Sequence, residues 1–251
     1  MSIDVTFPST YISQITINNP TKYNAMSRDM MRTLAETWDN LEQSDCRAIV
    51  ITGEGDKSFS AGADVSGDLS ASEETARMVN RALLKTDRFP KPIIAAVNGV
   101  CAGGGVELML SSDIRLACPD ARFGLPEVKW GIYPFGGATS KLISQINYVD
   151  AMKLLLTAEM VGSEEARRIG LVNEIVPRDG LLGEALRLAE LIAKNSPVAV
   201  QSVKAHISEG YAQVALSREA EEQAHGDTVR ASSDFEEGVA AFREKRTPNY
   251  S

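Results

Sequence analysis

Two glutamates are the residues whose surroundings most favour chemistry. Glu107 follows a triplet of glycines at 103–105 and lies among apolar residues at 106–110. A carboxylate there is costly unless it is paired, used in function or exposed on one face of its helix. Glu127 ends the run 123–127, where a strand is expected to turn, and taken alone it would be an ordinary surface acid. Two carboxylates near one backbone-amide site would suit general acid–base catalysis.

The glycine triplet offers a place where negative charge could be stabilised. It lies between an apolar strand expected at 93–97 and a helix expected to run through Leu110. The first amides of a helix lack intrahelical partners, and the helix dipole favours an anion there. The pattern is not a P-loop, because no Lys-Ser/Thr follows, and it is not GxGxxG, because Glu107 stands at the last glycine position. Close packing of helix on strand explains the triplet equally well.

A second run of small residues, at 59–64, also follows an expected strand. Its amides would be accessible, and Asp64 could cap the helix that follows. A nucleophilic role for Ser60 would need a histidine beside the core. The two histidines, His206 and His225, both lie in the helical tail, so a serine triad is disfavoured. The same scarcity, with no HExxH motif or cysteine cluster, predicts that no metal is bound.

Four basic residues, Arg77, Arg81, Lys85 and Arg88, recur at helical spacing in an expected helix that ends near Arg88. Residues at such spacing share one helix face. The face could contact nucleic acid or attract an anionic ligand. A solvated, charged helix face is the preferred interpretation.

Composition excludes several classes of protein. The formal net charge of −8 disfavours non-specific binding to nucleic acid or anionic membranes. The three cysteines lack CxxC spacing, which favours a reducing compartment. The first residues do not resemble a signal peptide, no apolar run is long enough to span a membrane, and the last three residues are not a peroxisomal signal. We therefore expect a cytoplasmic protein.

Strands and helices alternate along the first part of the chain. Strands are expected at 11–17, 47–52, 57–60, 93–97 and 114–117. Ser27 can cap a helix that runs to about Gln43, and residues 66–74, rich in Ser, Asp and Glu, are expected to form a loop. From Leu181 onward the periodicity is helical, with a break at Pro197. The pattern predicts an α/β core over residues 1–195 and a helical region over residues 196–251.

These pieces, in this order, resemble the crotonase (enoyl-CoA hydratase/isomerase) superfamily over nearly the whole chain. Each run is modest alone, and the specificity lies in their joint order. The runs are NNP (18–20), NAM (24–26), FSAGAD (59–64), KPIIAAVNG (91–99), AGGGVEL (102–108), SDI (112–114), FGLPE (123–127), GG (136–137), ARRIGLV (166–172) and FREKRTP (242–248).

The resemblance implies a spiral of repeated ββα units with a C-terminal α-helical trimerisation region. It implies that the amides of Ala63 and Gly104 form an oxyanion hole for a thioester carbonyl. It also implies an acyl-CoA substrate, a homotrimer or hexamer, and no permanently bound cofactor, since coenzyme A is part of the substrate. Coenzyme A contacts are expected at six residues: Lys22, Ala61, Asp64, Val65, Phe242 and Lys245.

Both glutamates of the hydratase type are present, so the resemblance is closest to enoyl-CoA hydratase. In that role Glu107 helps to activate water and Glu127 donates the α-proton. The alternatives are a Δ3,Δ2-enoyl-CoA isomerase, which generally needs only the acid at Glu127, or a hydratase or lyase for a branched, cyclic or aromatic acyl group. Phe135 stands where fatty-acid hydratases usually have a glycine, so Trp130, Tyr133 and Phe135 are expected to shape the acyl pocket together with the loop at 66–74.

A non-catalytic RNA-binding protein is the alternative from another class. It would use the basic residues of 77–88, but both glutamates are intact and the net charge is −8. Filter binding across a salt titration would distinguish the two, since phosphate contacts weaken steeply with salt.

Overall fold

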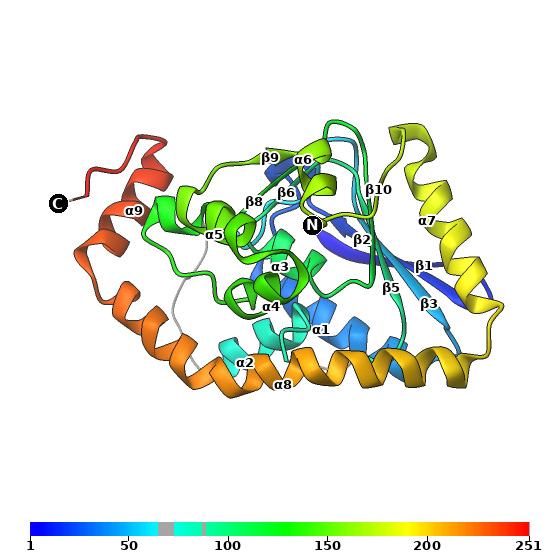
Figure 1. The fold of residues 1–251 in the computed structure, drawn as a ribbon. Coiled ribbons are helices and arrows are strands. Elements are labelled where there is room, and N and C mark those ends of the chain that lie inside the picture. The colour runs from blue at the N-terminus through cyan, green and yellow to red at the C-terminus, as the bar shows by residue number, and fades with distance from the viewer. Residues whose placement is uncertain (65–72, 87–88, 251) are drawn as a thin grey trace.

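The computed structural model describes residues 1–64, 73–86 and 89–250, and in it strands of two sheets alternate along the chain from β3 to β8 (Figure 1). The six-stranded sheet has the order β1-β2-β3-β5-β7-β10, and all its pairs are parallel except β1 with β2. The four-stranded sheet has the order β4-β6-β8-β9, with β8 and β9 antiparallel. The strands are β1 (Ser2–Ser9), β2 (Ile12–Asn18), β3 (Ala48–Gly53), β4 (Ser58–Ser60), β5 (Ile93–Val97), β6 (Val100–Ala102), β7 (Ile114–Ala117), β8 (Arg122–Gly124), β9 (Val161–Gly162) and β10 (Glu174–Ile175).

Successive turns of the fold repeat one unit: a strand of the large sheet, a short strand of the small sheet, and a helix. The units are β3-β4-α2, β5-β6-α3 and β7-β8-η2. The strands β3 and β5 are buried along their whole length, as strands covered on both faces must be. The ββα repeat and the C-terminal helices confirm the predicted fold class.

The helices cover the sheets and extend beyond them. The helix α7 packs against β3 and β5, and α1 contacts α2. The helices are α1 (Arg28–Gln43), α2 (Glu73–Ala82), α3 (Gly104–Met109), α4 (Ala138–Gln145), α5 (Tyr148–Thr157), α6 (Ser163–Arg168), α7 (Arg178–Ala193), α8 (Pro197–Arg230) and α9 (Ser233–Glu244), with the short 3-10 helices η1 (Pro20–Lys22) and η2 (Pro126–Trp130).

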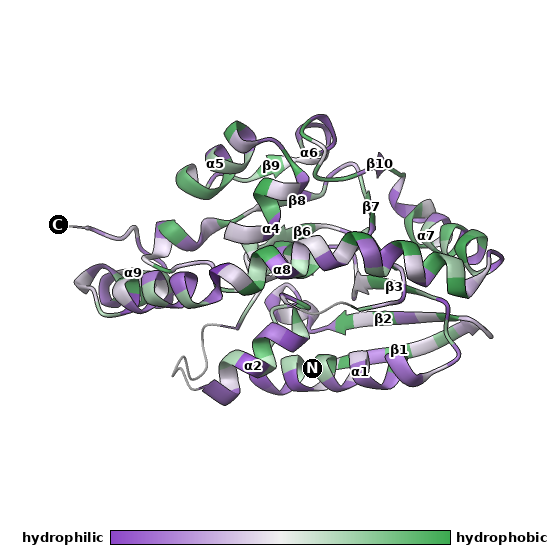
Figure 2. Ribbon diagram, turned by 60° about the horizontal axis from the view of Figure 1, so that its bottom comes forward, coloured by the Kyte–Doolittle hydropathy of each residue, from purple (hydrophilic) through white to green (hydrophobic). Residues whose placement is uncertain are grey.

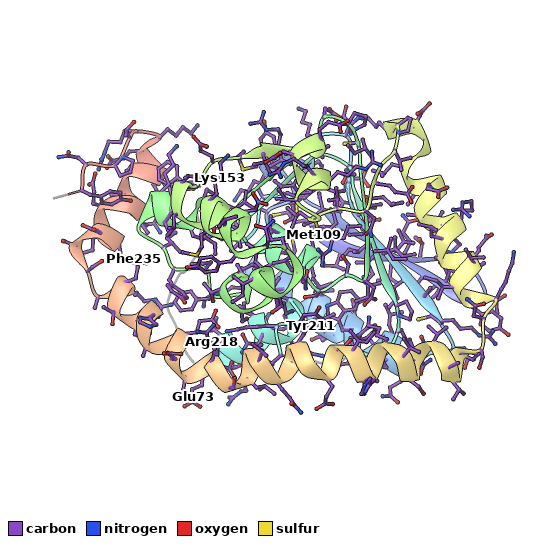
Figure 3. All side chains as sticks on the ribbon, viewed as in Figure 1. Glu73, Met109, Lys153, Tyr211, Arg218 and Phe235 are labelled. Atoms are coloured by element: carbon purple, nitrogen blue, oxygen red, sulfur yellow. The ribbon has the colours of Figure 1, made fainter. Side chains whose placement is uncertain are left out.

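The 34-residue helix α8 runs along one side of the molecule from α7 to α9 (Figure 1). Ser196 caps its start through the amide of Ala199, and Pro197 takes the first helical position, where its missing amide hydrogen costs nothing. Hydrophobic and hydrophilic residues alternate along α8 (Figure 2). Side chains fill the space between α8 and the core, and Tyr211 of α8 reaches the carbonyl of Ser144 on α4 (Figure 3).

Sequence patterns located the central elements well and the short ones poorly. The strands at 93–97 and 114–117, the strand that turns before Glu127 (β8) and the Ser27 cap are confirmed, whereas β1 and β6 were not expected. The helix expected to reach Arg88 ends at Ala82, and Leu84 has a φ of 48°. The predicted loop at 66–74 is two residues too long, because Glu73 already begins α2; residues 66–72 and Arg88 lie outside the described residues.

Candidate active site

The small-residue runs at 61–64 and 103–105 meet because β4 and β6 are parallel neighbours, so their carboxyl ends lie at one edge of the sheet. Gly62 has a φ of 91°, which favours glycine. A Cβ atom placed on Gly62 would lie 2.7 Å from the amide nitrogen of Gly104, so the two backbones touch. A bridge between Met26 and Ala63 fixes the first run from its other side.

The amides of Ala63 and Gly104 lie side by side at this contact. A Cβ atom on Gly104 would lie 3.5 Å from the amide nitrogen of Ala63. Within the described part of the chain, neither amide has a hydrogen-bond acceptor. Gly104 is also the first residue of α3, where the helix dipole favours negative charge. The pair can therefore hold an oxyanion.

Glu107 is buried, with 4% of its surface exposed, so the exposed helix face considered from the sequence is excluded. One carboxylate oxygen accepts a hydrogen bond of 3.2 Å from the amide of Ala138, at the start of α4. Burial raises the pKa of Glu107, and the charge of Glu222 adds to the rise, while the Ala138 amide and Lys85 oppose it. Together these effects raise the pKa of Glu107 above that of an ordinary glutamate.

Glu127 lies across the glycine turn, in η2. A Cβ atom on Gly103 would lie 3.0 Å from its Oε1 atom, and its Oε2 atom is buried with no hydrogen-bond partner among the described residues. Burial raises the pKa of Glu127, and repulsion from Glu107 raises it further. Two such carboxyls resist losing both protons, so the pair favours one acid and one base.

A cavity of about 1060 Å³ joins these groups. Ala61, Ala63, Asp64, Gly104, Glu107 and Glu127 line it, together with four predicted aromatic residues: Trp130, Tyr133, Phe135 and Phe242. Phe242 of α9 meets Trp130 edge to face, with ring centroids 5.1 Å apart. The C-terminal helix of the chain itself thus covers its own cavity.

Two other predicted residues, Lys22 and Lys245, do not line the cavity. Lys22 forms an ion pair of 2.7 Å with Asp64. Asp64 therefore does not cap the following helix as expected; α2 begins only at Glu73. Lys245 ends α9 in a left-handed conformation and is exposed. Val65 lies outside the described residues.

The remaining candidates for chemistry have structural roles. Ser60 is buried, where its hydroxyl donates to the carbonyl of Asn24 and accepts from the amide of Gly62, at 2.8 and 3.1 Å. His225 is exposed and stacks on Tyr133 with ring centroids 6.5 Å apart. In residues 1–64, 73–86 and 89–250, no group of His, Cys, Asp or Glu side chains is placed to hold a metal, and no helix has the length and apolar character needed to cross a membrane.

Lys85 and Glu222 form a buried ion pair of 3.0 Å that sequence reasoning missed. Lys85 was expected on a solvated helix face with Arg77 and Arg81. That expectation fits exposed Arg77, but Arg81 pairs with two acids of α1, and Lys85 lies beyond the end of α2 and lines the cavity. Thr139 of α4 also donates to Glu222, at 3.3 Å. No local pattern marks a contact between residues so far apart in the sequence.

Known proteins resemble this chain over almost its full length. The profile of the enoyl-CoA hydratase/isomerase family matches residues 9–251. Enoyl-CoA hydratase EchA19 of Mycobacterium tuberculosis is 38% identical over 244 residues, covering 94% of this chain and 91% of that protein. Crotonyl-CoA hydratase of Syntrophomonas wolfei is 37% identical over 240 residues, covering 93% and 92%. The solved structure of carnitinyl-CoA hydratase from Mycobacterium avium has a TM-score of 0.90 at 34% identity, covering 99% and 97%.

The match spans the sheets, both glutamates, the paired amides and the C-terminal helices. The chain belongs to the enoyl-CoA hydratase/isomerase family.

Proposed function

We propose that the protein is an enoyl-CoA hydratase, a hydro-lyase that adds water reversibly across the α,β double bond of an enoyl-CoA thioester. The observation that carries this is that buried Glu107 and half-buried Glu127 line one cavity with the amides of Ala63 and Gly104, for which the described residues provide no acceptor. The similarity to enoyl-CoA hydratase EchA19 and to crotonyl-CoA hydratase supports it.

The amides of Ala63 and Gly104 would bind the thioester carbonyl oxygen. Addition at the β-carbon moves negative charge onto that oxygen and forms an enolate. Donors already aimed at the oxygen stabilise this charge without reorganising, and one such donor is typically worth about 3 kcal/mol. The contact between Gly62 and Gly104 keeps both donors in place.

Glu107 would act as the base that removes a proton from water as its oxygen bonds to the β-carbon. Glu127 would act as the acid that delivers a proton to the α-carbon. The product thus gains a hydroxyl from water at the β-carbon and a proton from Glu127 at the α-carbon. The step leaves Glu107 protonated and Glu127 ionised, and transfer of one proton from Glu107 to Glu127 through solvent restores the pair for the next turnover. The raised pKa values of both carboxyls suit this sharing of one proton.

The coenzyme would lie at the mouth of the cavity. Ala61 would offer its carbonyl to the adenine, and Lys22, Asp64 and Val65 would lie near the coenzyme. Phe242 and Lys245 would add contacts from α9. Lys22 and Lys245 supply positive charge for the phosphates on an otherwise acidic protein.

We also propose that the chain assembles into a trimer or a dimer of trimers. Apolar side chains remain exposed on the C-terminal helices, among them Val198, Val203 and Ile207 of α8 and Leu191 of α7. Exposed apolar surface of this kind typically marks a protein interface.

The test is direct. Purified protein is mixed with crotonyl-CoA, the loss of enone absorbance is followed, and the product is identified by mass as one water heavier. A Δ3-enoyl-CoA thioester is tested in parallel, where an isomerase would create enone absorbance without adding water. Hydration of crotonyl-CoA supports the proposal, and isomerisation without hydration would replace it with the isomerase alternative.

A further inference from the structure

The aromatic ring of Phe135 packs against a glycine near the C-terminal end of α8. A Cβ atom on Gly226 would overlap this ring. Glycine destabilises a helix interior, so its presence in a long helix calls for a structural reason. Gly226 is buried, and the ring occupies the space that a side chain would need. The contact therefore depends on both residues.

Two further side chains hold the same ring. Tyr133 meets it edge to face, with ring centroids 5.6 Å apart. The guanidinium carbon of Arg230 lies 4.8 Å from the ring centroid, and Arg230 is fixed in turn by an ion pair of 2.9 Å with Asp227. A ring held on three sides cannot easily swing out of the cavity.

The ring stands next to the reacting groups. Phe135 precedes Gly136, and a Cβ atom on Gly136 would overlap the carboxylate of Glu107. Both Phe135 and Gly136 line the cavity. An acyl chain that extends past Glu107 therefore approaches the ring.

Polar side chains of α8, Glu219 and Gln223, line the cavity beside apolar Leu216 and Ala220. From α8, Glu219 accepts a hydrogen bond of 2.5 Å from Asn80, and Gln223 donates one of 2.8 Å to Asp227. The ion pair of Lys85 with Glu222 lies on the same stretch of α8. A methylene buried in an apolar pocket typically tightens binding about fourfold, whereas burial against groups that need polar partners forfeits that gain.

We propose that Phe135, seated on Gly226, closes the acyl end of the cavity and restricts the enzyme to enoyl-CoA thioesters with short acyl chains. This inference rests on the proposed hydratase function. It makes Phe135 a specificity-determining residue and Gly226 the residue that positions it.

The first test compares kcat/KM for crotonyl-, hexenoyl-, octenoyl- and decenoyl-CoA. The wild type should be most active on crotonyl-CoA and lose activity as the chain grows. Phe135→Ala should raise the ratio of octenoyl to crotonyl activity about tenfold or more, since a pocket discriminates by about that factor for one group that does not fit. An unchanged ratio in Phe135→Ala, or a wild type that prefers decenoyl-CoA, overturns the inference.

The second test examines the contact between Gly226 and the ring of Phe135. Gly226→Ala should lower kcat/KM for crotonyl-CoA, because the new methyl displaces Phe135. In the Phe135→Ala background the same change should have little effect. Gly210→Ala is the matched control, since it lies on α8 and a Cβ atom there meets nothing within 4 Å. If Gly226→Ala lowers kcat/KM for crotonyl-CoA by the same factor in the wild type and in the Phe135→Ala background, the two residues do not act together and the proposal fails.

The outcomes separate this inference from the proposed function. A wild type that hydrates no thioester of the series contradicts the proposed hydratase. A wild type that hydrates all chain lengths equally supports the hydratase and overturns the role of Phe135.

Discussion

Glu107 and Glu127 owe their chemical character to burial. A carboxyl in water titrates near pH 4.3, but a buried one holds its proton at higher pH because the charged form loses solvation. Glu107 is buried, and Glu127 is half-buried with a buried Oε2 atom. Loss of solvation raises both pKa values, and repulsion from a neighbouring carboxylate adds to each rise. At neutral pH such a pair favours the state with a single negative charge, in which one carboxyl is ready to accept a proton and the other to donate one.

This pairing predicts a bell-shaped dependence of kcat/KM on pH for crotonyl-CoA. Activity should fall at low pH, where both carboxyls are protonated and no base remains, and at high pH, where both are ionised and no acid remains. Because both pKa values are raised, the acid limb should lie above the pH range of an ordinary glutamate. The apparent pKa values read from the two limbs belong to the pair of carboxyls rather than to either residue alone. An acid limb near pH 4.3 would show that burial does not shift the pair.

The resemblance to the crotonase superfamily, carried by the order of the motifs, predicted this pair and the two amides beside it, and their catalytic roles stay a prediction. The apolar neighbours of Glu107 indicated an unusual carboxylate. The small residues at 59–64 and 103–105 indicated accessible backbone amides. Lys85 was missed because its partner Glu222 lies in the C-terminal helices. The sequence indicated that Phe135 was unusual but not that Gly226 receives its ring.

At the scale of elements, the ion pair of Lys85 and Glu222 ties three segments together. Lys85 follows α2, Glu222 belongs to α8, and Thr139 of α4 donates to the same carboxylate. The amide of Ala138, the residue before Thr139, binds Glu107. A change at Glu222 therefore reaches the active site through α4.

Glu222→Gln should destabilise the protein and lower its activity. Removing one partner of a buried ion pair leaves the other charge uncompensated, which typically costs about 3–5 kcal/mol. The measurement is the free energy of unfolding from urea titration, together with kcat for crotonyl-CoA. The exposed neighbour Glu221→Gln is the control and should have little effect. Equal stability of the two variants would show that the pair does not hold α8 in place.

Lys245, at the end of α9, is expected to contact the coenzyme. Lys245→Glu should raise the Michaelis constant more than it lowers kcat, because a contact with the coenzyme is remote from the reacting atoms and similar in ground and transition states. The matched control is Lys194→Glu, an exposed lysine just after α7, on the opposite side of the molecule from α9 (Figure 1). Steady-state kinetics with crotonyl-CoA measures both. If Lys245→Glu and Lys194→Glu behave alike, Lys245 is not a coenzyme contact.

The elements that could be predicted are those whose own residues determine them. The strand β5 is uniformly apolar and preceded by Pro90 and Pro92, and α1 has a serine cap and a regular apolar face. The end of α2 could not be located, because the backbone leaves the helix at Leu84 and then directs Lys85 toward α8. The short strand β6 has three residues and exists through pairing with distant neighbours.

In the whole molecule, the C-terminal helices contribute residues to two different surfaces. One side of α8 and α9 lines the cavity, with Gln223, Arg230 and Phe242 among the lining residues. Another leaves apolar residues exposed, including Val198 at 75% and Val203 at 62%. The division of the chain at 195/196 stays a prediction, although α8 begins close by, at Pro197.

Assembly is the prediction at this scale. Light scattering at micromolar concentration should give the mass of a trimer or a hexamer, because exposed apolar surface on α7 and α8 is stabilised by contact with another copy. Val203→Glu should weaken the assembly by placing a charge in the interface, whereas Glu221→Gln should not. A wild-type monomer at that concentration would contradict the prediction.

Whether both carboxyls carry the chemistry is decided by the hydration of crotonyl-CoA by Glu107→Gln, Glu127→Gln and the double variant. Glutamine keeps the size and hydrogen bonding of glutamate but cannot exchange a proton, and loss of general acid–base catalysis typically costs about a hundredfold to ten-thousandfold. We expect each single variant to lose hydration activity by this factor while its fold is unchanged. The double variant should be little less active than the poorer single variant, because residues that act as a unit are not additive. Near-normal activity of Glu107→Gln on every enoyl-CoA thioester would contradict this expectation.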